Sequence, residues 1–165
     1  FDASVCHYVE KSRFKSFLNK INLGNLVYTG VALKRLFLDP LVDVELVLDD
    51  GEPLLFSKVY FAACMNHPYE GGGFLFCPDA KTDDGMLDVI VASNLPRLKV
   101  LFVLPTAFFG KHTGFSGVDI FKCRKAEIRV KDSCPIHTDG EPVDFAKCLK
   151  AEVFEEQVML MAPAV

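Results

Sequence analysis

The chain has 165 residues, half of them hydrophobic, with 15 Phe, no Trp and a formal net charge of −4. This length supports one domain with its own core, and the hydrophobic content argues against a disordered chain. The 18 basic and 22 acidic residues argue against general nucleic-acid binding, which needs a basic surface. The sequence begins with FDAS rather than Met, so we expect a fragment of a longer protein, cut upstream.

Residues 7–38 favour two helices. Apolar residues of the first recur with the i, i+3, i+4, i+7 spacing of one helix face, and basic residues flank them. That face is expected to pack on a sheet, although its basic flanks would also suit an anionic membrane. The second helix is expected to begin at a capping asparagine, Asn22 or Asn25, and to end before Pro40.

After Pro40 the hydrophobic period becomes that of strands. The stretch VDVELVLDDGEPLLFSKVYFAACMN predicts two strands around an Asp50-Gly51 turn, and GGFLFCP and MLDVIVAS predict two more. A helix is predicted over LPRLKVLFVLPTAFFGKH, with Gly110 at its C-terminal stop. His112 follows that stop, where a histidine can complement the helix dipole.

The last third predicts short strands at a spacing of roughly ten residues: VDIFKC, KAEIRVK, CPIHTDGEPVDF and KAEVFEEQVMLMA. The predicted fold class is mainly β with some α (α+β). It is a single β-sandwich domain over residues 1–165, of short, mostly antiparallel strands, with N-terminal helices and one mid-chain helix. The six cysteines form no CxxC pair, which favours buried, reduced thiols in an intracellular protein over a zinc site.

The first of three Gly- and Asp-rich clusters is NHPYEGGGFLFCPDA. Gly71, Gly72 and Gly73 leave one turn without side chains. Such a turn allows close approach of a ligand or another strand, and it equally suits a hairpin or a bulge. It is not a Walker loop, since no GK[ST] follows.

The second cluster, AKTDDGMLDVI, places acidic residues in a turn before a predicted strand. The carboxylate of Asp84 and the backbone carbonyls of Lys81 and Met86 could form part of an oxygen cage for Mg²⁺ or Ca²⁺, completed by water. A calcium EF-hand loop is excluded because its D-x-D-x-D-G ladder is absent. A plain solvated turn would explain the same residues.

The third cluster, HTDGEPVDF, places Asp139 and Glu141 around a glycine between two predicted strands. In a hairpin turn both carboxylates would be solvated and inert. In a cleft, paired carboxylates alter each other's ionisation, and one can serve as a general base. The residues alone do not decide between these two interpretations.

Taken in order, GGGFLFCPDAKTDDGMLDVIV, FFGKHTG and HTDGEPV resemble the C-terminal half of the diacylglycerol kinase/sphingosine kinase superfamily, with the bacterial soluble lipid kinases nearest. The opening FDASV also resembles the phrase that begins this half, and the resemblance covers nearly the whole chain. It departs from the family's usual Asn-Gly before the glycine run, where this sequence has NHP. The resemblance implies an NAD kinase/diacylglycerol kinase C-terminal-domain fold, with a nucleotide-binding domain that lies outside this sequence.

The resemblance also implies an activity, the transfer of the γ-phosphoryl group of ATP to a lipid hydroxyl such as that of diacylglycerol. Glu141 would take the proton from that hydroxyl, with Asp139 as its acidic neighbour. Asp84, with the carbonyls of Lys81 and Met86, would hold a structural Mg²⁺. Both acidic corners would then face one shared crevice.

The implied partners are a lipid substrate, a transient membrane surface and the chain's own N-terminal nucleotide-binding domain, which would hold most of the ATP. A homodimer is left open, and no nucleic-acid partner is expected. The enzyme would be cytoplasmic and peripherally associated with a membrane, and the fragment alone would be inactive. Two rivals stay open, an NAD kinase-like enzyme and a non-catalytic β-rich ligand-binding module.

Overall fold

The computed structural model describes residues 34–154. The first predicted helix and the capping asparagines therefore lie outside the described residues. Residues 34–38 are helical, and this helix ends before Pro40 as predicted. Between residues 34 and 154, no helix reaches the length and hydropathy that crossing a membrane requires.

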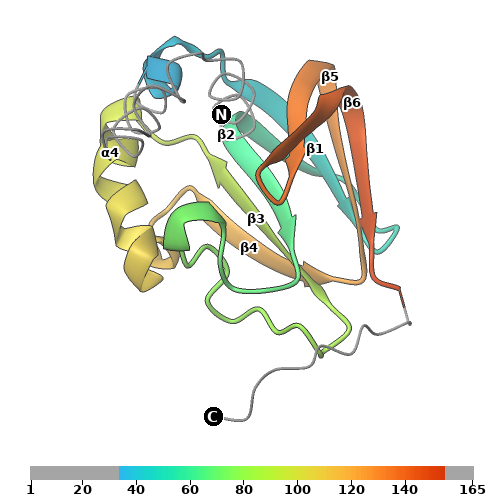
Figure 1. The fold of residues 1–165 in the computed structure, drawn as a ribbon. Helices are drawn as coiled ribbons and strands as arrows, with labels where there is room; N and C mark the ends of the chain where they lie inside the picture. The colour runs from blue at the N-terminus through green and yellow to red at the C-terminus, as the bar shows by residue number, and fades with distance from the viewer. Residues whose placement is uncertain (1–33, 155–165) are drawn as a thin grey trace, which may run out of the picture.

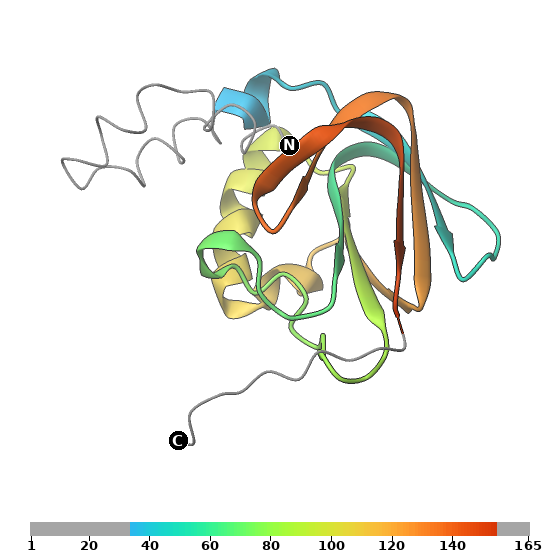
Figure 2. The ribbon, with the colours of Figure 1, turned by 45° about the vertical axis from the view of Figure 1, so that its right-hand side comes forward.

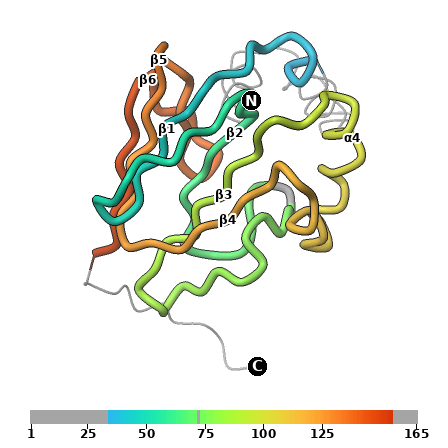
Figure 3. The backbone as a smooth tube through the Cα atoms, turned by 180° about the vertical axis from the view of Figure 1, so that it is seen from behind, coloured from blue at the N-terminus to red at the C-terminus, as the bar shows by residue number. Residues whose placement is uncertain are grey.

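Six strands form one antiparallel sheet in the order β4-β3-β2-β1-β5-β6 (Figure 1; Figure 3 shows it from behind). The strands are β1 (Val42–Leu48), β2 (Leu54–Met65), β3 (Leu87–Ser93), β4 (Val118–Cys123), β5 (Lys125–Thr138) and β6 (Glu141–Glu152). The helical segments are η1 (Gly71–Gly73), α4 (Arg97–Thr106), η2 (Ala107–Phe109) and η3 (Lys111–Gly114). The predicted β-rich fold with a mid-chain helix is confirmed.

The sheet curls around one hydrophobic cluster, and the β5–β6 hairpin bends midway along its length (Figures 1 and 2). The buried residues of this cluster are Val44, Leu46, Val59, Leu87, Val89, Val91, Cys123 and Ala126. They come from β1 to β5, and Ala151 of β6 packs against them. Because one core is shared by strands from both ends of the sheet, the sheet behaves as two facing layers.

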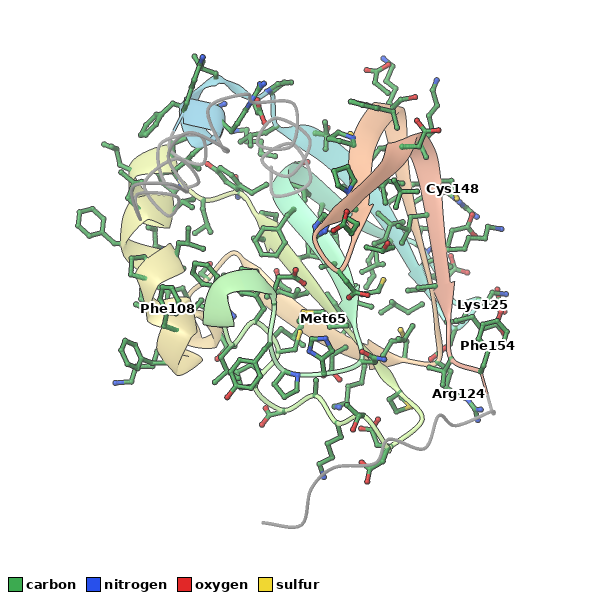
Figure 4. The ribbon with its side chains drawn as sticks, viewed as in Figure 1. Met65, Phe108, Arg124, Lys125, Cys148 and Phe154 are labelled. Carbon is green, nitrogen blue, oxygen red and sulfur yellow. The ribbon has the colours of Figure 1, made fainter. Side chains whose placement is uncertain are left out.

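The chain passes from one layer to the other at a sharp corner. Only Arg124 separates β4, which pairs with β3, from β5, which pairs with β1. The carboxylate of Asp49 accepts hydrogen bonds from the backbone N–H groups of Arg124 and Lys125, at 2.8 and 2.9 Å. The turn after β1 thus fixes the corner, which lies at the lower right of Figure 4.

Every residue of β3 is buried, because both faces of this strand are covered. On the second face, the loop after β2 and the helix α4 pack over Ile90 and Ala92. A series of stacked rings runs through this layer, from Phe61 to Phe76 and Phe74 and on to the half-exposed Phe108. The rings attach the loop and the end of α4 to the sheet.

The predicted mid-chain helix is confirmed as α4 followed by η2, and it stops at Gly110 as expected. Gly110 has a left-handed φ of 66°, and a Cβ there would lie 2.9 Å from Cγ of Pro78. Glycine is therefore needed at this position for both its backbone angle and its lack of a side chain.

His112 does not have the helix-end role that its position in the sequence suggested. It is 3% exposed, and its Nε2 donates a hydrogen bond of 2.9 Å to the backbone carbonyl of Phe76. Nδ1 is buried with no hydrogen-bond partner. Burial lowers the pKa of His112, and the hydrogen bond to Phe76 offsets only part of that effect. The neutral ring thus ties the loop after β2 to η3.

We expect the free energy of unfolding to fall as the pH is lowered from about 7 to about 5. In that range the unfolded chain binds a proton on His112 near the ordinary pKa of 6.5, whereas the folded site resists protonation. Urea unfolding at several pH values would measure the effect. The slope should shrink in His112→Gln and persist in His67→Gln, a matched change at an exposed histidine. Equal slopes in all three proteins would contradict the prediction.

Two predicted elements differ from the structure. The stretch GGFLFCP forms η1 and a loop instead of a strand. In the last third VDIFKC forms β4 as predicted, but two long strands of 14 and 12 residues follow where short ones were expected. Most of the predicted strand KAEVFEEQVMLMA lies outside the described residues. Pro135 lies inside β5, where the register with β6 shifts on both sides of it, so the strand continues past the proline through a bulged region.

The cysteines of the described chain are all free thiols. Cys77 and Cys123 are buried as predicted, and burial raises the pKa of Cys77 to about 12 and that of Cys123 to about 11. Thiols of this kind are unreactive near neutral pH. Cys148, in contrast, is exposed on β6.

Candidate functional site

The acidic corner before β3 is a turn stabilised by one of its own carboxylates. Oδ1 of Asp84 accepts a hydrogen bond of 3.0 Å from the backbone N–H of Met86, and Oδ2 lies 3.3 Å from Nζ of Lys122. Partial desolvation acts to raise the pKa of Asp84, but these two hydrogen bonds outweigh it and the pKa is lowered. Lys81 and Asp83 are exposed beside it.

Lys122 of β4 connects this corner to a buried carboxylate. Its Nζ lies 3.0 Å from Oδ2 of Asp88 and 3.4 Å from the backbone carbonyl oxygen of Asp79. Asp88 is 1% exposed and stands directly across from Lys122 in the β3–β4 pair. The hydrogen bond to Asp88, with a smaller contribution from Asp84, raises the pKa of Lys122. Three oxygen atoms thus surround one ammonium group.

The oxygen atoms at this corner suit Mg²⁺ in kind, because carboxylate and backbone carbonyl oxygens are its preferred ligands. In the described residues, however, no group of three His, Cys, Asp or Glu side chains could hold a metal ion by itself. Lys122 already supplies positive charge to Oδ2 of Asp84. A metal at Asp84 would therefore compete with Lys122, and the Mg²⁺ site of Asp84, Lys81 and Met86 stays a prediction.

A pocket of about 430 Å³ opens beside this corner. Its walls come from the loop after β2, from β3 and β4 and from the segment around η3. Its lining residues are Cys77, Pro78, Asp79, Asp88, Gly110, Thr113, Val118, Ile120 and Lys122. The pocket places the Lys122 and Asp88 charges on a wall that is otherwise partly apolar.

The second acidic corner is the turn between β5 and β6. Asp139 and Gly140 have φ angles of 50° and 81°, and Thr138 pairs with Glu141, as in a two-residue type I′ hairpin. His137 accepts a hydrogen bond at Nδ1 from the backbone N–H of Gly140. Both Asp139 and Glu141 are exposed, and neither carboxylate has a hydrogen-bond or ion-pair partner within residues 34–154. They are accessible to a group outside this part of the chain.

The resemblance led us to expect that the two acidic corners face one crevice. Neither Asp84 nor the Asp139–Glu141 turn lines the pocket beside β3 and β4, so the shared crevice stays a prediction. The β5–β6 hairpin has its turn at Glu141 and its open end where Lys125 pairs with Glu152. Asp84 contacts Lys122, which lies just before that open end. Because the hairpin bends between its two ends, strand pairing alone does not place the turn relative to Asp84.

The glycine-rich cluster forms a short 3₁₀ turn, η1, closed by a bridge between Glu70 and Phe74. A Cβ added at Gly71 or Gly73 would meet no atom within 4 Å. Gly73 has a φ of 88°, which favours glycine, but packing within the described chain does not explain Gly71. A group outside the described chain can approach this backbone closely.

Two residues of this region, Asp88 and Lys122, were missed from the sequence. Asp88 belongs to the strand LDVIVAS, where a carboxylate on an otherwise apolar strand was the available signal. A charge in such a strand needs a buried partner, since an unpaired buried carboxylate is very costly. The identity of that partner depends on strand pairing, which the sequence pattern does not give.

Comparison with known sequences identifies the family. A sequence model of the family described as "YegS C-terminal NAD kinase beta sandwich-like domain" matches residues 1–161. The chain is 40% identical over 92 residues to YtlR of Bacillus subtilis (strain 168), which is named as a lipid kinase. It is 34% identical over 111 residues to a diacylglycerol kinase of Mycobacterium tuberculosis (strain H37Rv). These matches cover 56% and 66% of this chain, but only 30% and 33% of the relatives.

Comparison with solved structures gives the same fold. A Bacillus anthracis str. Sterne protein described as a diacylglycerol kinase superposes with a TM-score of 0.61 at 20% identity. The match covers 81% of this chain and 43% of that one. At 20% identity this likeness shows the fold alone. The family assignment comes from the sequence model that matches residues 1–161. The chain therefore belongs to the YegS C-terminal NAD kinase beta sandwich-like domain family and is a C-terminal domain of the lipid and diacylglycerol kinase type.

Proposed function

We propose that this chain is the part of an ATP-dependent lipid kinase that supplies a general base to the hydroxyl of a diacylglycerol-like lipid. The observation that carries the proposal is the β5–β6 turn, which holds Asp139 and Glu141 outside the fold without partners in the described chain. The chain spans about a third of its curated relatives. If the nucleotide-binding domain completes the active site, the base of this chain has to project from its own domain toward that partner. Exposed carboxylates in a turn meet this requirement.

In the proposed reaction the lipid hydroxyl oxygen attacks the γ-phosphorus of ATP. The bond from that phosphorus to the β–γ bridging oxygen breaks, and ADP leaves with the electron pair. Glu141 takes the hydroxyl proton, and Asp139 adds negative charge beside it. A positioned base typically contributes about 100- to 10,000-fold in rate. Alignment and charge neutralisation supply the larger part in phosphoryl transfer.

The proposal also includes a structural Mg²⁺ at the turn before β3, apart from the catalytic carboxylates. Asp84, with the backbone carbonyls of Lys81 and Met86, would hold it. The ion would add positive charge that orders the turn before β3. ATP would be bound mainly by the N-terminal nucleotide-binding domain. The enzyme would act in the cytoplasm, where ATP is available, at the membrane surface that supplies its lipid.

Labelled ATP tests the proposed activity in the full-length protein. We expect label from the γ position to enter a lipid when diacylglycerol, a sphingoid base, ceramide and undecaprenol are offered in detergent micelles. Residues 1–165 alone should transfer nothing, because the nucleotide loop is absent from them. Label in NAD instead of any lipid would favour the NAD kinase-like alternative, and no transfer to any acceptor would favour a ligand-binding module.

A further inference from the structure

The helix α4 is apolar on two opposite faces. Its inner face packs on the sheet through residues that include Val100, Val103 and Leu104. Its outer face carries Leu98 and Phe102, which are 65% and 76% exposed. A helix on the surface of a globular protein normally keeps polar residues on the side that faces water.

The apolar outer face continues past the end of the helix. Phe109 in η2 is 75% exposed, and Phe108 beside it is 47% exposed. Leu98, Phe102 and Phe109 follow one another at spacings of four and seven residues, so they line one side of the helical segment. Phe108 stacks on Phe74 at a ring distance of 4.2 Å, which attaches this end firmly to the domain. We call Leu98, Phe102, Phe108 and Phe109 the α4 outer face.

The segment that carries the α4 outer face holds only positive charges. The sequence contains no acidic residue between Asp88 and Asp119, although the whole chain has a net charge of −4. Lys99 and Lys111 are exposed, and neither makes an ion pair within the described part of the chain. Lys99 neighbours Leu98 on α4, and its Nζ lies 5.9 Å from the ring centre of Phe115, which follows η3.

Arg97 anchors the start of the helix instead of contributing to this surface. Its guanidinium group donates to the backbone carbonyls of Leu36 and Asp39, at 2.6 and 2.8 Å. The position of α4 is thereby fixed relative to the helix at residues 34–38. An exposed apolar helix face with lysines on the same segment differs from a groove, which would suit an inserted peptide.

We infer that the α4 outer face is a docking surface for a membrane that contains anionic lipids. Phe and Leu side chains on one face of a helix insert at the boundary between headgroups and acyl chains, and nearby lysines attract anionic headgroups. The segment from Val89 to Val118 adds no carboxylate of its own that would repel anionic headgroups. This inference rests on the proposed function, because a lipid substrate has to be reached in a bilayer.

Flotation of the purified chain with vesicles tests the inference without any catalysis. The vesicles are phosphatidylcholine alone, or phosphatidylcholine with phosphatidylserine, and neither contains diacylglycerol. We expect binding to the anionic vesicles, which weakens at about 1 M salt, where the screening length is about 3 Å. No binding to anionic vesicles at low salt would overturn the inference.

Matched variants locate the surface. Phe102→Ser with Phe109→Ser should weaken partitioning about tenfold or more, since two large apolar side chains are lost from the contact. Leu55→Ser with Phe154→Ser is the control, because these residues are 80% and 79% exposed elsewhere. Figure 4 shows Phe154 on the opposite side of the sheet from Phe108. An equal loss in the control pair would overturn the inference.

A second pair of variants tests the charges. Lys99→Glu with Lys111→Glu should weaken binding to anionic vesicles about tenfold or more and have less effect on neutral vesicles. The control is Lys131→Glu with Lys147→Glu, at exposed lysines of β5 and β6. If α4 variants change self-association in solution and leave vesicle binding intact, the face contacts protein and the inference fails. Vesicle binding without any lipid phosphorylation would keep this inference and remove the proposed function.

Discussion

Glu141→Gln in the full-length protein is expected to lower lipid phosphorylation by about 100- to 10,000-fold, the usual contribution of a positioned general base. The glutamine keeps nearly the same shape but cannot accept the hydroxyl proton. Because Glu141 is exposed at the first position of β6 and has no partner in the described chain, the fold should tolerate the change. Turnover number and Michaelis constant, measured separately, would show whether the loss is in turnover.

The control for this variant lies at the other end of the same strand. Glu152→Gln removes an exposed carboxylate where β6 pairs with Lys125 of β5, far along the hairpin from the turn. Its activity should stay within about a factor of two, as expected of a surface change away from the chemistry. Asp139→Asn should produce a smaller loss than Glu141→Gln. Unchanged turnover in Glu141→Gln would remove this residue from the mechanism.

Lys122→Met is expected to lower the free energy of unfolding by about 2–4 kcal/mol, because it leaves a buried carboxylate without its charged partner. Asp88 is 1% exposed, and Lys122 is the cation that contacts it at 3.0 Å. The methionine keeps the length of the side chain, so loss of packing is small. Urea unfolding of the isolated chain would measure the change.

Two further variants serve as controls for Lys122→Met, one at an exposed ion pair and one that also removes the buried carboxylate. Lys125→Met removes an ion pair with Asp50, whose side chain is 75% exposed, and should cost clearly less than Lys122→Met because water screens the pair. Asp88→Asn combined with Lys122→Met should recover part of the loss, since the unpaired charge is then gone. If Lys122→Met and Lys125→Met cost the same, the buried contact does not stabilise the fold.

Lys122→Met also tests the prediction that Mg²⁺ binds at Asp84. Without Lys122, the carboxylates of Asp84 and Asp88 lose a competing positive charge. We therefore expect Mg²⁺ to raise the melting temperature of Lys122→Met more than that of the parent chain. Asp84→Asn in the same background should abolish the difference, and no Mg²⁺ effect on either protein would remove the metal from this corner.

Local pattern was enough to predict most of the fold. Alternation of apolar residues predicted β1, β2, β3 and β4, and turn chemistry located the hairpin at Asp50-Gly51. At Asp139-Gly140 the sequence left a hairpin turn as one of two interpretations, and the structure has that turn. The apolar run GGFLFCP was wrongly predicted as a strand. Its backbone bonds go to Pro68 and Ala107, and Phe74 and Phe76 pack among other rings. The apolar residues of this segment, such as Phe76 and Cys77, are buried, but the segment does not pair as a strand of the sheet.

The candidate site was predictable only in part. The sequence singled out Asp84, Asp139 and Glu141, because acidic residues next to glycine stand out in a turn. It did not predict that Lys122 would contact Asp84, since that contact depends on the pairing of β3 with β4. Nor could it predict that Thr138 pairs with Glu141 around a two-residue turn that leaves both carboxylates exposed.

The corner at Arg124 has a consequence for how the protein is made. In the pairing of β1 with β5, Val44 lies opposite Val130. During synthesis, one edge of β1 therefore stays unpaired until the much later strand β5 has left the ribosome. Until then β1 presents unpaired backbone groups, the kind of open strand that invites aggregation. Distant pairing of this kind also slows folding. Chains that stop before Lys125 should therefore precipitate, even though the first four strands are complete.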